Sequence, residues 1–243
     1  MTSLAINTNL PLKSTQSWLH LSLIIFKNNY LPFLLLQMII SVCIFLPFMS
    51  MFLVPLLIGK FILCTQKIVD KKPLYIQFIL TKLFNNYFLT KLAFIAFCLN
   101  LVILLSQYLI QNKFFATLAL DSAIYSYLTV LLIIPTLILN LSLWLSPAIC
   151  VLNNDIAPKD AMLISLKASF KNICPLLIYM LTIIIVTLII ATPIIAINLW
   201  LWSYFHNLWL LIPFAVIGYT LLMCWGAILN ISTYFIYQNI FNF

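Results

Sequence analysis

The chain has 243 residues, of which 65% are hydrophobic and 7% are charged, and its mean hydropathy is +1.17. So few charges cannot cover the surface of a water-soluble protein, so the composition excludes a soluble globular protein and indicates one embedded in lipid. The net charge of +8 does not indicate nucleic-acid binding, because no basic cluster lies in a soluble domain. The six cysteines form no C-x-x-C pair, so neither a disulfide nor a metal site is predicted.

Long apolar stretches follow one another along the chain, of the length that a hydrocarbon core about 30 Å thick requires of a helix. They are apolar on every helix face, whereas a lipid-facing β-barrel strand alternates polar and apolar residues. We therefore predict an all-α, polytopic transmembrane bundle that forms one integral membrane domain over residues 1–243. The six predicted spans are residues 30–47, 50–66, 88–111, 125–150, 174–201 and 208–230.

Three amphipathic stretches precede pairs of spans and predict helices that lie in the membrane interface. In residues 13–27, Lys13, His20 and Lys27 share one helix face, and Trp18 lies on another. The second stretch is residues 74–86. The third, residues 158–171, starts with Pro158, a residue that favours the first turn of a helix. An amphipathic, aromatic tail follows the last span.

A short motif marks the point where each interfacial helix meets a span. It reads Phe26-Lys27-Asn28 in the first copy, Phe84-Asn85-Asn86 in the second and Phe170-Lys171-Asn172 in the third. The recurrence predicts a threefold internal repeat of interfacial helix, span, link and span. The candidate repeat units are residues 13–68, 73–150 and 158–230.

The lysines predict the orientation. Eleven of the twelve lie on the side that carries the three interfacial helices, and Lys113 alone lies on the other side. By the positive-inside rule, the interfacial helices and both termini are therefore expected in the cytoplasm. Lys60 lies near the end of the second span, where its side chain is expected to extend outward to the interface.

Three stretches resemble an uncharacterised family of bacterial six-span inner-membrane proteins, related to the membrane domain fused to some glycerophosphodiester phosphodiesterases. They are Ser17-Trp18 through Phe26-Lys27-Asn28; Pro55-Leu56-Leu57-Ile58-Gly59 with Lys72-Pro73-Leu74; and Leu145-Ser146-Pro147-Ala148 with Ala157-Pro158, Asp160-Ala161-Met162, Ser165, Phe170-Lys171-Asn172 and Pro175. The ending Tyr237-Gln238-Asn239-Ile240-Phe241 also fits. The family is richer in Arg, Gly and Ala than this chain. The resemblance implies a multi-pass protein of the bacterial inner (plasma) membrane, and it implies no catalytic residues.

Acids and bases are scarce: four Asp and two His are present, and Glu is absent. No zinc-protease, serine-hydrolase or paired-carboxylate motif occurs. His20 and His206 are expected on opposite sides of the membrane, so they cannot form one site. We therefore predict no catalytic residue, no cofactor, no metal site and no enzyme activity.

Two sets of polar residues remain as candidates for function. The first lies within the spans, where amides either join helices by hydrogen bonds or line a substrate pathway. Its members are Gln37, Asn100, Asn140 and Asn198, with Thr187 nearby. The second is a cytoplasmic basic face that either anchors the chain to anionic lipid headgroups or docks a membrane protein partner. Its members are Lys27, Lys82, Lys167 and Lys171.

These features favour a non-enzymatic role in membrane organisation, or as a subunit or assembly partner of a complex. The alternative is a transporter or lipid-handling permease with a cavity between helix pairs. Amides satisfied by neighbouring helices favour the first role, and a cavity beside Asn100 or Asn140 favours the second.

Overall fold

A computed structural model describes residues 4–7, 10–11, 14–74, 78, 86–111, 122–153, 155–205 and 208–241. These residues are helical with short connections and contain no strand. The prediction of an all-α membrane bundle is confirmed. The helices are α1 (Ser14–Asn28), α2 (Tyr30–Ile44), α3 (Pro47–Val69), α5 (Tyr87–Gln111), α6 (Ser122–Leu152), α7 (Pro158–Lys171), α8 (Ile173–Phe205) and α9 (Leu208–Phe241).

Among the described residues, five helices are long and apolar enough to cross a membrane, within α3, α5, α6, α8 and α9. The first predicted span is shorter than expected, because α2 has 15 residues and rises only about 22 Å. Helices α1 and α2 meet at a bend of 105°, and together they account for a sixth candidate span. The other observed helices begin and end close to the predicted spans, except at the C-terminus.

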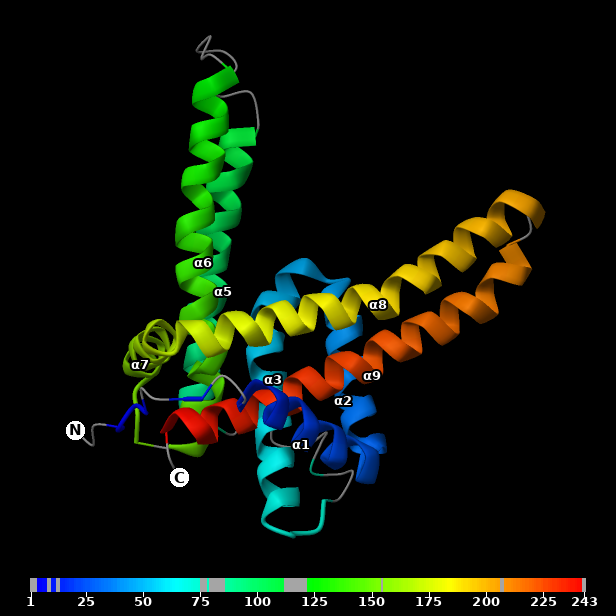
Figure 1. The fold of residues 1–243 in the computed structure, drawn as a ribbon. Coiled ribbons are helices and arrows are strands. Elements are labelled where there is room, and N and C mark those ends of the chain that lie inside the picture. Colours follow the sequence, from blue (N-terminus) through cyan, green and yellow to red (C-terminus); the bar gives the residue numbers. More distant parts are fainter. Residues whose placement is uncertain are drawn as a thin grey trace.

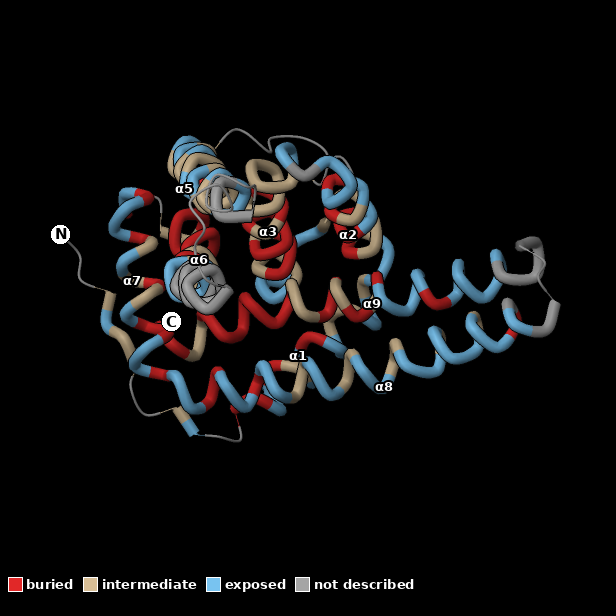
Figure 2. Tube along the Cα trace, turned by 90° about the horizontal axis from the view of Figure 1, so that it is seen from above, coloured by how far each residue is buried: buried red, intermediate tan, exposed pale blue. Residues whose placement is uncertain are grey.

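The molecule consists of a packed base and two long hairpins that diverge from it (Figure 1). We define the base as α1, α2, α3 and α7 with residues 86–96, 139–153, 173–179 and 223–241. The first arm is the rest of the α5–α6 hairpin, and the second arm is the rest of the α8–α9 hairpin. The two arms leave the base in clearly different directions (Figures 1 and 2). Figure 2 shows that buried residues concentrate in the base, whereas the second arm is mostly exposed.

Aromatic side chains fill the base where α1, α6 and α8 meet. Trp18 is fully buried and lies edge-on to the ring of Tyr179, with 5.8 Å between ring centroids. Trp144 stacks on the same ring at 6.1 Å. The Tyr179 hydroxyl forms a hydrogen bond with Ser232 of α9. This cluster therefore joins four helices around Tyr179.

Ser165 fixes helix α7 to helix α6. The Ser165 hydroxyl donates to the Leu141 carbonyl (2.9 Å) and accepts from the Leu145 backbone N–H (3.2 Å). In a regular α-helix, that N–H would bond to that carbonyl directly. The hydroxyl is thus inserted into the backbone ladder of α6, an arrangement that bends helices. Ala161 and Ala168, both fully buried, let α7 lie close to its neighbours.

The C-terminal tail is not a separate element, which corrects the predicted end of the last span at residue 230. Helix α9 continues to Phe241, and no proline or glycine interrupts it after Gly226. The aromatic side chains of the tail are buried in the base, Tyr237 to 1% exposure. The backbone N–H of Asn7 donates to the Ile240 carbonyl at 2.8 Å, so an N-terminal segment lies against this end.

The expectation that Lys60 extends outward is wrong. Its side chain is 3% exposed, and its ammonium lies 3.9 Å from the ring centroid of Phe78. The ammonium of Lys67, two turns later on α3, lies 3.3 Å from the same centroid. The attraction between a cation and the face of an aromatic ring stabilises the buried ammonium, which has lost most of its contact with water. Of the second predicted interfacial helix, residues 74–86, the structure describes Leu74, Phe78 and Asn86, and the other residues fall outside the described residues.

Candidate functional site: polar groups of the base

An asparagine stands at each of the three junctions that the repeated motif marks, and each forms a different set of bonds. Asn86 precedes α5, and its side-chain oxygen accepts from the backbone N–H of Leu89 at 3.0 Å, which caps the helix. Asn172 separates α7 from α8, and its side-chain nitrogen donates to the carbonyls of Ala168 (3.1 Å) and Asn7 (3.0 Å). Asn29 separates α1 from α2 and gives α2 no side-chain cap.

The outward face of α7 combines cations with large apolar side chains. Lys167 and Lys171 are exposed, and Leu163 and Phe170 are 54% and 52% exposed. These four residues recur at spacings of three and four, so they share one side of the helix. The opposite side carries small buried residues, among them Ser165. Helix α7 is therefore fixed to the base on one side and presents a basic, apolar face on the other.

The structure describes three of the four residues of the predicted basic face. Lys27 is exposed in the last turn of α1, and Lys167 and Lys171 are exposed on α7. Helices α1 and α7 lie in separate parts of the base in both views (Figures 1 and 2). Lys82 lies outside the described residues, so a ring of four lysines stays a prediction.

Gln37 is the predicted intramembrane amide that joins two helices. It is 9% exposed on α2, and its side-chain oxygen accepts from Asn230 of α9 at 3.0 Å. Gly226 of α9 allows this approach, because a Cβ there would meet the Gln37 amide nitrogen at 2.7 Å. Thr187 makes a similar link between α8 and α9 by accepting from the indole N–H of Trp225 at 2.9 Å.

The other intramembrane amides do not join helices. The side chains of Asn100 and Asn198 donate to carbonyls of their own helices, Ala96 and Ile194, both at 2.8 Å. Asn140 is exposed on α6, and no hydrogen bond links its side chain to another described residue. Neither of the two hollows described below is lined by Asn100 or Asn140.

A groove of about 690 Å³ opens where α1 meets α2 and where α3 ends. Lys71 and Lys72 from the turn after α3 and Asn28 and Asn29 from the α1–α2 junction supply its polar lining. The sequence contained signals for this groove: Asn28 ends the first copy of the motif and Asn29 follows it, and both lysines follow the second predicted span. Their meeting was missed because sequence gives no distance between two turns.

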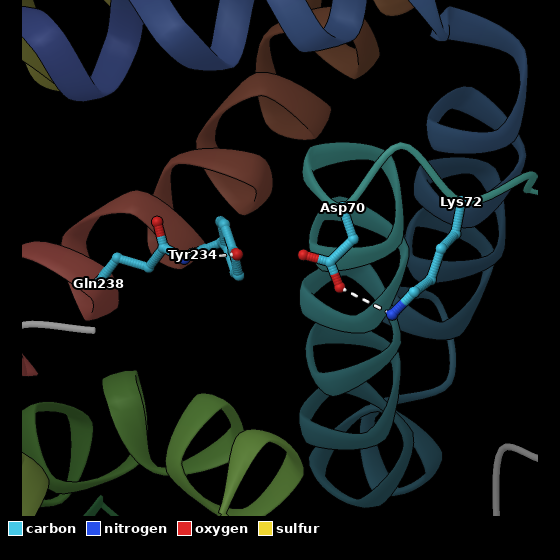
Figure 3. A network of polar contacts seen from close by, with 4 residues as sticks. All are labelled: Asp70, Lys72, Tyr234 and Gln238. Atoms are coloured by element: carbon cyan, nitrogen blue, oxygen red, sulfur yellow. Dashed lines mark hydrogen bonds and ion pairs between the residues drawn. The ribbon is translucent and has the colours of Figure 1, made fainter.

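A smaller pocket of about 170 Å³ lies between α3, the end of α6 and the end of α9. Within its lining, the Tyr237 hydroxyl accepts from the side chain of Asn153, and the Tyr234 hydroxyl accepts from Gln238 at 2.6 Å. Figure 3 shows the Tyr234–Gln238 pair opposite Asp70, whose carboxylate pairs with Lys72 at 3.1 Å. Sequence reasoning missed this pocket, because the last span was predicted to end at residue 230, before Tyr234, Tyr237 and Gln238.

The described residues contain no cluster of three or more His, Cys, Asp or Glu side chains arranged to hold a metal ion. No family model, curated protein or solved structure matches the chain. The family resemblance described above therefore stays an expectation.

Proposed function

We propose that this integral membrane protein is a non-enzymatic subunit or assembly partner of a membrane complex, which docks its partner on the outward face of α7. The observation that carries the proposal is that face: Lys167 and Lys171 alternate with exposed Leu163 and Phe170. Interfaces combine apolar contact area with charges that select the partner. Ser165 fixes α7 to α6, so the helix is already ordered before a partner binds. This order lowers the entropic cost of docking.

The orientation and location belong to the same proposal. The lysine asymmetry supports a multi-pass protein of the bacterial inner membrane with both termini and α7 in the cytoplasm. The exposed apolar surfaces of the arms suit contact with lipid chains.

Purification from native membranes followed by mass spectrometry tests the docking role. We expect a stoichiometric protein to co-purify with the wild type and to be lost from the double variant Lys167→Gln/Lys171→Gln. The matched control is Lys72→Gln/Lys91→Gln, which removes two exposed lysines that lie outside α7. Retention of the partner by the first variant, or equal loss from both, contradicts the proposal.

Lipid handling is the second candidate, and the groove of about 690 Å³ beside Lys71 and Lys72 favours it. The amides of the spans give it less support, since Gln37 is bonded to Asn230, and Asn100 and Asn198 bond to their own helices. A stoichiometric lipid with no protein partner in the same experiment would support this second role over the first.

A further inference from the structure

The groove beside the α1–α2 junction has two chemically different sides. Its polar lining is supplied by Asn28, Asn29, Lys71 and Lys72, and Leu31 and Ile68 are among its apolar lining. An occupant that satisfies both sides carries a polar group joined to an apolar one. A free anion would contact only the lysines and amides, and an extended acidic peptide would leave the apolar side uncovered.

The groove also lies at the ends of membrane helices. Helix α3 ends at Val69, the last residue of a candidate span, and α2 begins at Tyr30 with an apolar sequence. Groups at such ends lie at the depth of lipid headgroups. The lysines of the groove are thus at headgroup depth, and its apolar residues continue toward the acyl chains.

The charge around the groove is positive. Lys60, Lys67, Lys71 and Lys72 lie within thirteen residues of α3 and the turn after it, and Asp70 is the acidic residue among them. Asp70 pairs with Lys72, but the two side chains are 39% and 65% exposed, so water screens the pair. Lys71 has no acidic neighbour within salt-bridge distance among the described residues.

We propose that this groove binds the headgroup of an anionic phospholipid, with Lys71 and Lys72 beside the phosphate and Leu31 and Ile68 beside the start of the acyl chains. The proposal rests on the chain being embedded in a membrane, and it does not depend on the docking role of α7. It gives the lysines of the turn after α3 a binding role. From the sequence alone, these lysines indicate only the orientation of the chain by the positive-inside rule.

The test uses the full chain in nanodiscs made from equal amounts of phosphatidylglycerol and phosphatidylcholine, with bound lipids counted by native mass spectrometry. The loss variant is Lys71→Asn/Lys72→Gln. Asparagine suits position 71, because Lys71 has a left-handed backbone with φ of 55°. The gain variant is Asp70→Asn, which frees Lys72 from its partner. The control is Lys91→Gln/Lys159→Gln, which removes the same charge away from the groove.

We expect the wild type to retain phosphatidylglycerol in preference to phosphatidylcholine. The loss variant should lower that preference by about tenfold, because it removes two lysines that attract anionic lipid and Asp70 offsets part of that attraction. The gain variant should raise the preference, an effect that a purely structural role of this turn does not produce. The control should match the wild type.

Three outcomes overturn the proposal. They are an unchanged preference in the loss variant, an equal fall in the control, and full competition by inorganic phosphate, which would make the groove a site for soluble anions. Failure here leaves co-purification through α7 untouched, because the two loss variants alter different lysines. A partner lost only from Lys167→Gln/Lys171→Gln, with lipid preference intact, separates the two roles.

Discussion

The base and the second arm share the apolar helix α8, yet only the base is packed on several sides. Helix α8 passes through both regions. Its residues Leu176 and Tyr179 are 4% and 2% exposed in the base, whereas Ile189 and Leu199 are 67% and 64% exposed in the arm. The difference lies in the neighbours, since the arm has two helices and the base has parts of eight. Apolar character alone therefore does not mark the packed region of a membrane protein.

Polar groups distinguish the two regions better. In the base, side chains bond between helices, as in Asn230 with Gln37 and Tyr179 with Ser232. In the second arm, Thr182, Asn198 and Thr220 donate to carbonyls of their own helices. The Trp225–Thr187 bond near the foot of the arm joins its two helices. Hydrogen bonds between helices thus help to hold the base, and the arm needs few of them.

Truncating a buried tryptophan of the base should give the largest effect. Trp18→Ala removes a fully buried side chain, so we expect the free energy of unfolding in mixed micelles to fall by about 3–5 kcal/mol. The matched control is Trp200→Ala in the second arm, where the ring is 55% exposed and the expected loss is about 1 kcal/mol or less. Equal losses would contradict the distinction between base and arm.

A substitution at Gly59 should give the next largest effect. A Cβ at this position would lie 2.6 Å from a methyl group of Leu89 and 3.1 Å from one of Val151, so α3 could not stay as close to α5 and α6. Overpacking of this kind costs about 1–3 kcal/mol. Unfolding of Gly59→Ala in the same micelles measures it. A variant as stable as the wild type would show that the helices separate freely.

Removing the serine that is inserted into α6 should cost less. Ser165→Ala takes away both bonds to α6, but the Leu145 N–H and the Leu141 carbonyl can then approach each other directly. We therefore expect a loss of about 1 kcal/mol, with faster hydrogen exchange over α7. Ser203→Ala is the control, because that exposed hydroxyl bonds only within its own helix, to the Trp200 carbonyl. The same exchange rates in both variants would contradict the role of Ser165 in holding α7.

The Gln37–Asn230 bond should give the smallest effect. Hydrogen bonds between membrane helices contribute about 0.6 kcal/mol on average. A double-mutant cycle with Gln37→Ala and Asn230→Ala should therefore give a coupling energy of about that size. Asn198→Ala is expected to show no coupling to either position. A coupling energy of zero between Gln37 and Asn230 would show that this bond does not stabilise the base.

Sequence reasoning predicted the helices well, because apolar length and proline positions act locally. Helix α7 was predicted over residues 158–171 and lies there, since Pro158 starts it and Asn172 ends it. Features that depend on contacts between helices could not be predicted from the sequence. The burial of Lys60 requires Phe78 to cover it, and the continuation of α9 to Phe241 depends on the surfaces that bury its aromatic residues. The groove and the small pocket require turns from distant segments to meet.

In the proposed topology, α1 and α7 lie on the cytoplasmic side of a membrane, and the tips of the two arms lie on the other side. The most direct test places single cysteines at Lys113, His206 and Lys171 in a chain freed of its native cysteines, and labels intact cells with a membrane-impermeant thiol reagent. The account predicts labelling at positions 113 and 206, with labelling at 171 only after the cells are opened. Labelling of position 171 in intact cells, or protection of position 206, would contradict it.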